Sequence, residues 1–129
     1  NNRGVDSVES SENIEEIVIE LAKKYNCVIA ATGKVDIVTD GEKIAKIENG
    51  DAILGSVTGT GCMTGALIGS ACGASKDYFS GTVTMISTMG IAGEKAKAIG
   101  GGNGTFRRVI MDTVYNMNEK DFLENAKIK

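Results

Sequence analysis

Residues 55–73 read GSVTGTGCMTGALIGSACG, and this segment constrains the fold more than any other part of the chain. The glycines and threonines before Cys62 are typical of a tight turn. From Met63 onward the apolar residues recur at helical spacing, so the turn leads directly into a helix. That helix consists mostly of small residues, which lets another element pack very close to it. The segment therefore predicts a glycine-rich turn, a helix start and a crowded helix surface.

A helix start of this kind is suited to binding an anion. The first backbone N–H groups of a helix have no partner within it, and the helix dipole adds partial positive charge there. A glycine-rich approach lets these amides surround a phosphoryl group without interference from side chains. The amides of Gly59, Thr60, Gly61 and Cys62 are the candidate anion hole. A tight turn with close packing needs the same residues, so both interpretations stay open at this point.

Cys62 is the candidate catalytic residue of the chain. Helix N-termini favour the thiolate form of a cysteine, and a thiolate can accept a proton. The alternative is a buried and inert cysteine, the commonest role of a free thiol. Cys27 lies in an apolar run and Cys72 lies late in the predicted helix, so we expect both to be core residues.

The segment before the glycine-rich turn predicts a helix, a strand and a hairpin. An amphipathic helix is expected over residues 11–25, with Ser10 or Ser11 as its N-cap and a left-handed exit at Asn26. The run CVIAA, residues 27–31, predicts a strand that is buried on both faces, as in a parallel sheet. A hairpin turn is expected at Asp40-Gly41.

Thr32 follows the predicted buried strand directly. Ligands of open α/β sheets bind outside the carboxyl ends of the strands, so Thr32 is placed to meet one. A residue that merely opens a turn is an equally good interpretation. Beyond the glycine-rich segment we expect helices over residues 76–98 and from about residue 106, separated by GGGNGTF, and then a short helix or a frayed tail.

Composition excludes several classes of function. The chain has 129 residues, a net charge of −3 and 5% aromatic residues, which argues against nucleic-acid binding. No apolar run approaches the roughly 20 residues of a membrane helix, and the polar start does not resemble a signal peptide. The chain has no histidine and no CxxC pair among its 3 cysteines, so we expect no metal site, no disulfide framework and a cytoplasmic protein.

Two familiar phosphate motifs can be compared with the glycine-rich segment. The Walker A lysine and its following serine or threonine are absent. GTGCMTG fits a relaxed dinucleotide pattern, with Asp77 as the acidic residue for a ribose. A dinucleotide-binding oxidoreductase fragment therefore remains an alternative, although the segment follows a predicted hairpin and not the first parallel strand.

Taken in order, the segments AATGKVDIVTDGEKIAKIENG, VTGTGCMTGALIGSACG and GNGTF resemble the C-terminal half of the hydroxyethylthiazole kinase family, within the ribokinase-like superfamily. The resemblance runs from RGVDS to the final helix. It implies that residues 1–129 are the C-terminal portion of a single α/β kinase domain whose N-terminal half is absent. The implied fold is a mostly parallel sheet with a β-hairpin and flanking helices.

The resemblance also implies a reaction and roles for individual residues. Family members phosphorylate the hydroxyethyl group of 4-methyl-5-(2-hydroxyethyl)thiazole with ATP and Mg²⁺, in thiamine biosynthesis and salvage, and they form homotrimers. By position, Thr32 is similar to the ATP-contacting residue, Gly59 to a thiazole-site residue and Cys62 to the catalytic base. Most ribokinase relatives carry an aspartate at that last position, so an aspartate in place of Cys62 would have favoured another ribokinase-fold small-molecule kinase. That kinase and a non-catalytic binding fragment are the alternatives. The isolated chain is expected to be inactive.

Overall fold

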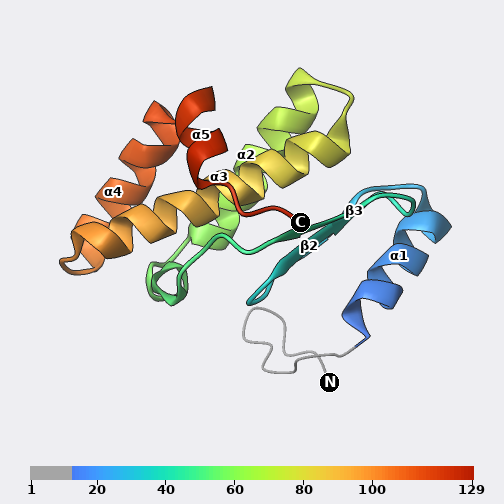
Figure 1. Ribbon diagram of the computed structural model, residues 1–129, viewed down its shortest axis with the longest axis horizontal. Coiled ribbons are helices and arrows are strands. Elements are labelled where there is room, and N and C mark those ends of the chain that lie inside the picture. Colours follow the sequence, from blue (N-terminus) through green and yellow to red (C-terminus); the bar gives the residue numbers. More distant parts are fainter. Residues whose placement is uncertain (1–12) are drawn as a thin grey trace.

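A computed structural model of the chain describes residues 13–129, and its elements are labelled in Figure 1. In chain order they are α1 (Ile14–Tyr25), β1 (Ile29–Ala31), β2 (Asp36–Thr39), β3 (Ile44–Ile47), the 3₁₀-helix η2 (Ala52–Ser56), α2 (Thr60–Ala74), α3 (Tyr78–Ile99), α4 (Asn103–Asn116) and α5 (Glu119–Asn125). Within residues 13–129, no helix has both the length and the apolar composition that a membrane crossing requires.

The three described strands form one antiparallel sheet in the order β1-β2-β3. Ile29 pairs with Thr39, and Asp36 pairs with Ile47. The predicted mostly parallel sheet is therefore wrong for these strands. The physical reason is the connection between β1 and β2, because residues 32–35 are far too few for the crossover of about a dozen residues that parallel neighbours need.

β1 lies at the edge of the described sheet, with β2 as its neighbour. Ala30 is exposed on it, and so is Cys27 just before it. The prediction that residues 27–31 form a strand buried on both faces is thus wrong within residues 13–129. The prediction that Cys27 is a core residue is wrong for the same reason.

The β2–β3 turn confirms the hairpin predicted at Asp40-Gly41. Gly41 has φ +97°, a left-handed conformation that favours glycine. The Asp40 carboxylate accepts hydrogen bonds from the backbone N–H groups of Lys43 at 2.7 Å and Glu42 at 2.9 Å. These N–H donors, that of Lys43 first, hold the pKa of Asp40 below its usual value. The Thr39 hydroxyl donates to the Lys43 carbonyl at 2.7 Å and so closes the turn.

α1 begins at Ile14 and buries Val18 and Ala22 on the side that packs against the sheet. Asn26 adopts the predicted left-handed conformation, with φ 48°, and its N–H caps the helix end. The predicted N-cap residues, Ser10 and Ser11, lie outside the described residues.

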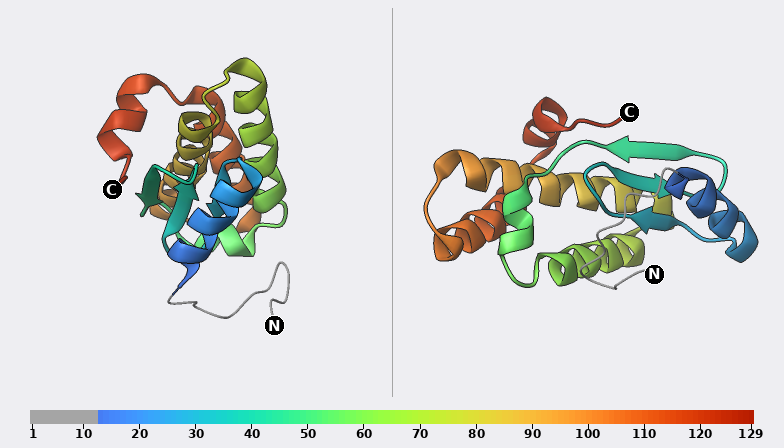
Figure 2. Two further views of the ribbon diagram at one scale, coloured as in Figure 1. Left: turned by 90° about the vertical axis from the view of Figure 1, so that its right-hand side faces the viewer. Right: turned by 90° about the horizontal axis from the view of Figure 1, so that it is seen from below.

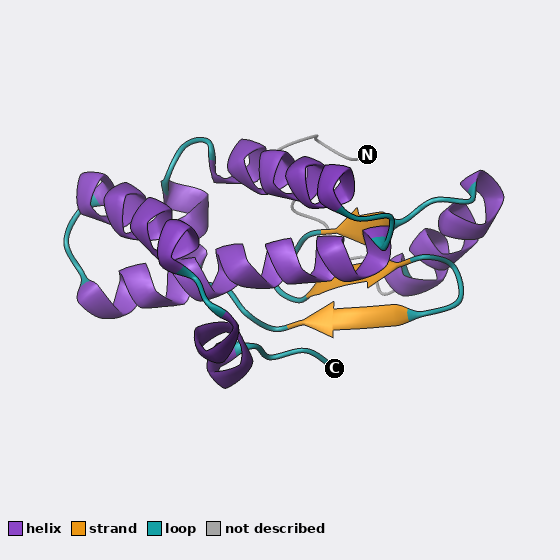
Figure 3. Ribbon diagram, turned by 90° about the horizontal axis from the view of Figure 1, so that it is seen from above, coloured by secondary structure: helices purple, strands orange, loops and turns teal. Residues whose placement is uncertain are grey.

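α3 is the central element: it packs against α2, α4 and α5 and against β2 and β3, whereas α1 packs against β1 and β2. Figure 3 shows α3 crossing the middle of the molecule. The apolar cluster on its first half includes Val38 and Ile47 from the sheet together with Ile86. The cluster on its second half joins α3 to η2, α2 and α4, and its buried members are Ile53, Val57, Met89, Ala92, Ala96, Val109 and Ile110. The predicted helix over residues 76–98 is confirmed by the bounds of α3.

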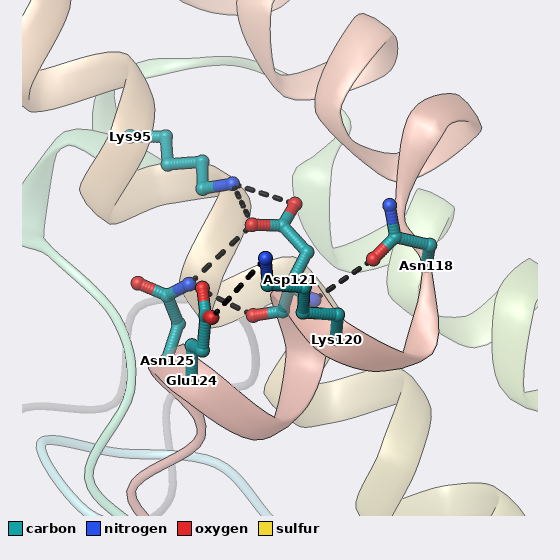
Figure 4. A network of polar contacts seen from close by, with 6 residues as sticks. All are labelled: Lys95, Asn118, Lys120, Asp121, Glu124 and Asn125. Carbon is teal, nitrogen blue, oxygen red and sulfur yellow. Dashed lines mark hydrogen bonds and ion pairs between the residues drawn. The ribbon is translucent and has the colours of Figure 1, made fainter.

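α5 is anchored to α3 by the polar network of Figure 4. The Lys95 ammonium donates to both carboxylate oxygens of Asp121, each at 2.7 Å. Asn118 caps the helix by accepting from the Asp121 N–H at 2.8 Å, and the side chain of Asn125 donates to the Asp121 carbonyl at 2.8 Å. Of the two alternatives predicted for the end of the chain, the short helix is therefore confirmed, and it is held against α3.

The tail after α5 continues the sheet along the outer side of β3. The Lys46 N–H donates to the Lys129 carbonyl at 3.0 Å, and the Lys129 N–H returns a bond to the Lys46 carbonyl at 2.8 Å. Glu48 donates in the same way to the Lys127 carbonyl at 2.9 Å. One edge of the sheet is thus covered by the chain's own C-terminus.

We expect Lys95→Met to loosen α5. The pair is about one-third exposed, at 35% and 30%, so its loss should lower the free energy of unfolding by about 0.5–1 kcal/mol. Hydrogen exchange should speed up across α5, and urea unfolding should report the stability change. Lys120→Met is the matched control, because the Lys120–Glu124 pair is 4.0 Å long and at least 61% exposed. Equal effects of the two substitutions would contradict this account.

Candidate functional site

The candidate site is the start of α2. Gly59 is the N-cap residue, with φ +94°, and the helix begins at Thr60 as the sequence predicts. The Met63 N–H donates to the Gly59 carbonyl at 2.9 Å, which closes the first turn. Among residues 13–129, no acceptor is bonded to the backbone N–H groups of residues 59–62. The donors that an anion hole needs are thus present and free within the described part of the chain.

The side chain of Thr60 ties the start of α2 to the preceding segment. Its hydroxyl donates to the Leu54 carbonyl at 2.8 Å and so ties the first residue of α2 back to η2. η2 is itself capped by Asp51, whose carboxylate accepts from the Ile53 N–H at 3.0 Å. The first turn of α2 contains no acidic residue, so no carboxylate of that turn opposes an incoming anion.

Cys62 is the third residue of α2 and is exposed. The alternative of a buried, inert thiol at this position is therefore wrong within residues 13–129. Cys72, nearly three turns further along, is half-buried. A catalytic role for Cys62 stays a prediction.

Thr32 directly follows β1 and is exposed in the turn that leads to β2. That turn is held by Asp36, whose carboxylate accepts a hydrogen bond from the Gly33 N–H at 2.9 Å. Burial raises the pKa of Asp36, and the Gly33 N–H opposes this rise. Figures 1 and 3 place the β1–β2 turn and the start of α2 toward the same end of the long axis. The hydrogen bonds within residues 13–129 do not link the two segments.

One contact at this site was missed by sequence reasoning. The Asn103 side chain donates to the Ser56 carbonyl at 3.1 Å, and the Ser56 hydroxyl donates to the Asn103 amide oxygen at 3.4 Å. These bonds bring the start of α4 against η2. The sequence marks Asn103 only as part of a glycine-rich break, since nothing local signals a partner 47 positions away.

The structure around the glycine-rich turn does not match a dinucleotide-binding site. The glycine-rich turn follows an antiparallel hairpin and η2, whereas the fingerprint requires a parallel strand directly before it. Asp77, the residue considered for a ribose, caps α3 by accepting from the Ser80 N–H at 3.1 Å. That bond holds the pKa of Asp77 below its usual value.

No group of three or more cysteine and carboxylate side chains within residues 13–129 is arranged to hold a metal ion. A divalent cation involved in catalysis would have to be bound chiefly by other groups, such as the phosphates of a nucleotide.

The geometry of residues 13–129 defines a chain of the α/β class with a helix N-terminus that is free within those residues and an exposed thiol in its first turn. A family model described as "Hydroxyethylthiazole kinase family" matches residues 1–120. The chain belongs to the hydroxyethylthiazole kinase family.

Individual relatives agree with that family. The chain is 45% identical over 130 residues to a hydroxyethylthiazole kinase of Alkaliphilus oremlandii, covering 98% of this chain and 48% of the relative. It is 47% identical over 119 residues to one of Desulfitobacterium hafniense, covering 91% and 45%. The solved structure of the hydroxyethylthiazole kinase protein from Pyrococcus horikoshii matches with a TM-score of 0.85 and 35% identity, over 92% of this chain and 46% of that one. The chain thus spans about half the length of the relatives it matches.

We expect an added methyl group to lower the stability of the protein at Gly59 but not at Gly61. A Cβ at either position meets no atom within 4 Å, so only the backbone conformation differs. Gly59→Ala forces a left-handed conformation and should lower the free energy of unfolding by about 1 kcal/mol. Gly61→Ala lies in the helix and should leave it unchanged or raise it by up to about 1 kcal/mol. Urea unfolding of the two variants tests this, and a stability loss for Gly61→Ala equal to that of Gly59→Ala would contradict it.

Proposed function

We propose that this chain is the C-terminal portion of a ribokinase-like kinase domain, residues 1–129, that phosphorylates 4-methyl-5-(2-hydroxyethyl)thiazole with ATP in thiamine biosynthesis and salvage. The observation that carries the proposal is the start of α2, where residues 59–62 offer backbone donors that are free within residues 13–129, beside the exposed thiol of Cys62. Relatives that bear the name hydroxyethylthiazole kinase support the choice of substrate.

The proposed chemistry is phosphoryl transfer to the hydroxyl of the thiazole alcohol. Such transfers depend mainly on positioning and on neutralising charge that develops on the phosphoryl oxygens. The amides of Gly59, Thr60, Gly61 and Cys62 serve as donors to those oxygens. Cys62 accepts the proton of the attacking hydroxyl, Gly59 contacts the thiazole and Thr32 contacts ATP.

Mg²⁺ is proposed to arrive with ATP, bound to its phosphates. Residues 13–129 supply no cluster of metal ligands, so the phosphates of the nucleotide would hold the ion. A cytoplasmic homotrimer is proposed for the complete kinase, by similarity to the family.

A chimera provides the test. It joins this chain to the part of the Alkaliphilus oremlandii kinase that the chain does not match. In this chimera, Cys62→Asp should keep or raise kcat for ATP-dependent phosphorylation of the thiazole alcohol, because a carboxylate is also a proton acceptor. Cys62→Ala should lower kcat, by up to about 10²–10⁴-fold if base catalysis contributes fully.

Cys72→Ala is the matched control, since it removes a thiol from the same helix far from its start. Equal kcat values for Cys62→Ala and the unmodified chimera would remove the base role. A folded chimera without any thiazole kinase activity would overturn the proposed function. The isolated 129-residue chain is expected to show no turnover.

A further inference from the structure

The aspartate at the start of β2 occupies an unusual place for a charged side chain. Side chains alternate between the two faces of a strand, so Asp36 shares a face with Val38, which belongs to the apolar cluster on α3. Burial there raises the pKa of the Asp36 carboxyl. Within residues 13–129 no lysine or arginine forms an ion pair with it. A carboxylate removed from water lowers stability unless hydrogen bonds compensate, so the bond that Asp36 makes indicates its purpose.

That bond holds the turn between β1 and β2. The Asp36 carboxylate accepts from the Gly33 N–H at 2.9 Å, and Gly33 directly follows Thr32. Residues 32–35 are exposed and make no other hydrogen bond within residues 13–129. The backbone that carries the Thr32 side chain is therefore held in place by a single carboxylate at the start of the next strand.

A second aspartate holds the turn at the other end of the sheet. Asp40 accepts from the N–H groups of Glu42 at 2.9 Å and Lys43 at 2.7 Å. Because consecutive strands run antiparallel, the two turns lie at opposite ends of β2. Figure 1 and the right panel of Figure 2 place the β1–β2 turn at the end nearer to η2 and the start of α2. The turn held by Asp36 thus lies toward the candidate site, and the turn held by Asp40 lies away from it.

We propose that Asp36 is a positioning residue for ATP: by accepting the Gly33 N–H, it holds the backbone that presents Thr32 to the nucleotide. Thr32 contacts ATP in the proposed function, and the role of Asp36 rests on that contact. Asp36 itself touches neither the nucleotide nor a reacting atom. A turn that is ordered in advance reduces the conformational entropy lost when ATP binds, so the effect of Asp36 falls on nucleotide affinity.

Substitutions of Asp36 in the chimera described above test this role. Asp36→Ala removes the acceptor, so the KM for ATP and the calorimetric Kd of a non-hydrolysable ATP analogue should both rise by about 3–10-fold, as loss of one hydrogen bond implies. Because the start of α2 is unchanged, kcat and the KM for the thiazole alcohol should stay the same. Asp36→Asn keeps an oxygen that accepts the Gly33 N–H, so it should restore both ATP values. Exchange of the Gly33 amide should be faster in Asp36→Ala than in Asp36→Asn.

Asp40→Ala is the matched control, because it opens the aspartate-held turn at the opposite end of β2. It should lower Tm through loss of its hydrogen bonds and leave the affinity for ATP unchanged. Equal losses of ATP affinity in Asp40→Ala and Asp36→Ala would overturn the positioning role, since loosening of the whole sheet would then be the cause. Asp36→Asn binding ATP as weakly as Asp36→Ala would overturn it too, because the negative charge would then be what ATP binding needs.

A double-mutant cycle tests whether Asp36 acts through Thr32. In a Thr32→Val background the contact to ATP is already lost, so adding Asp36→Ala should change the Kd of the ATP analogue little further. Fully additive effects of the two substitutions would contradict the proposal.

The binding measurement also separates the role of Asp36 from the reaction. A chimera that binds the ATP analogue with the expected dependence on Asp36, but leaves the thiazole alcohol unphosphorylated, would overturn the proposed function and support the positioning role. A chimera that phosphorylates the alcohol, with unchanged KM and Kd in Asp36→Ala, would overturn the role of Asp36 and leave the proposed function standing. A chimera with no measurable affinity for the analogue would overturn both.

Discussion

The close approach of α3 to the segment that leaves the sheet is the contact on which the rest of the structure depends. A Cβ at Gly90 would lie 2.7 Å from the backbone of Asn49, and one at Gly93 would lie 2.7 Å from the side chain of Leu54. Real Cβ atoms do not approach other atoms so closely, so glycine is required at Gly90, where the Asn49 backbone lies opposite, and a side chain at Gly93 would force Leu54 to move. The long helix can therefore lie directly on the chain between β3 and η2.

Two consequences follow from this crossing. Leu54, held against α3, presents the carbonyl that accepts the Thr60 hydroxyl at 2.8 Å and so sets the start of α2. Asn49 is buried at the crossing, and its side chain accepts from the Lys127 N–H at 2.7 Å and donates to the Asn125 carbonyl at 2.8 Å. The Gly93–Leu54 contact thus positions the candidate anion hole, and the Gly90–Asn49 contact positions the C-terminal tail that closes the sheet at β3.

Features governed by neighbouring residues could be predicted from the sequence. The hairpin turn at Gly41, the exit of α1 at Asn26 and the helix after Gly59 are each set by local conformation, and each is confirmed. Features governed by distant partners could not. Residues 27–31 look like a central strand, but what lies beside a strand depends on the whole sheet, and within residues 13–129 the sheet ends there. The hydrogen bonds between Asn103 and Ser56, like those around Asn49, join positions far apart in the chain. No local sequence pattern reveals such partners.

The central claim is that the amides at the start of α2 receive the phosphoryl group that is transferred. A crystal structure of the chimera with a non-hydrolysable ATP analogue and the thiazole alcohol tests this most directly. We expect terminal phosphoryl oxygens within about 2.7–3.2 Å of at least two backbone nitrogens among residues 59–62. The acceptor hydroxyl should lie beside the sulfur of Cys62. A terminal phosphate bound elsewhere, with these amides in contact only with water or with protein, would contradict it.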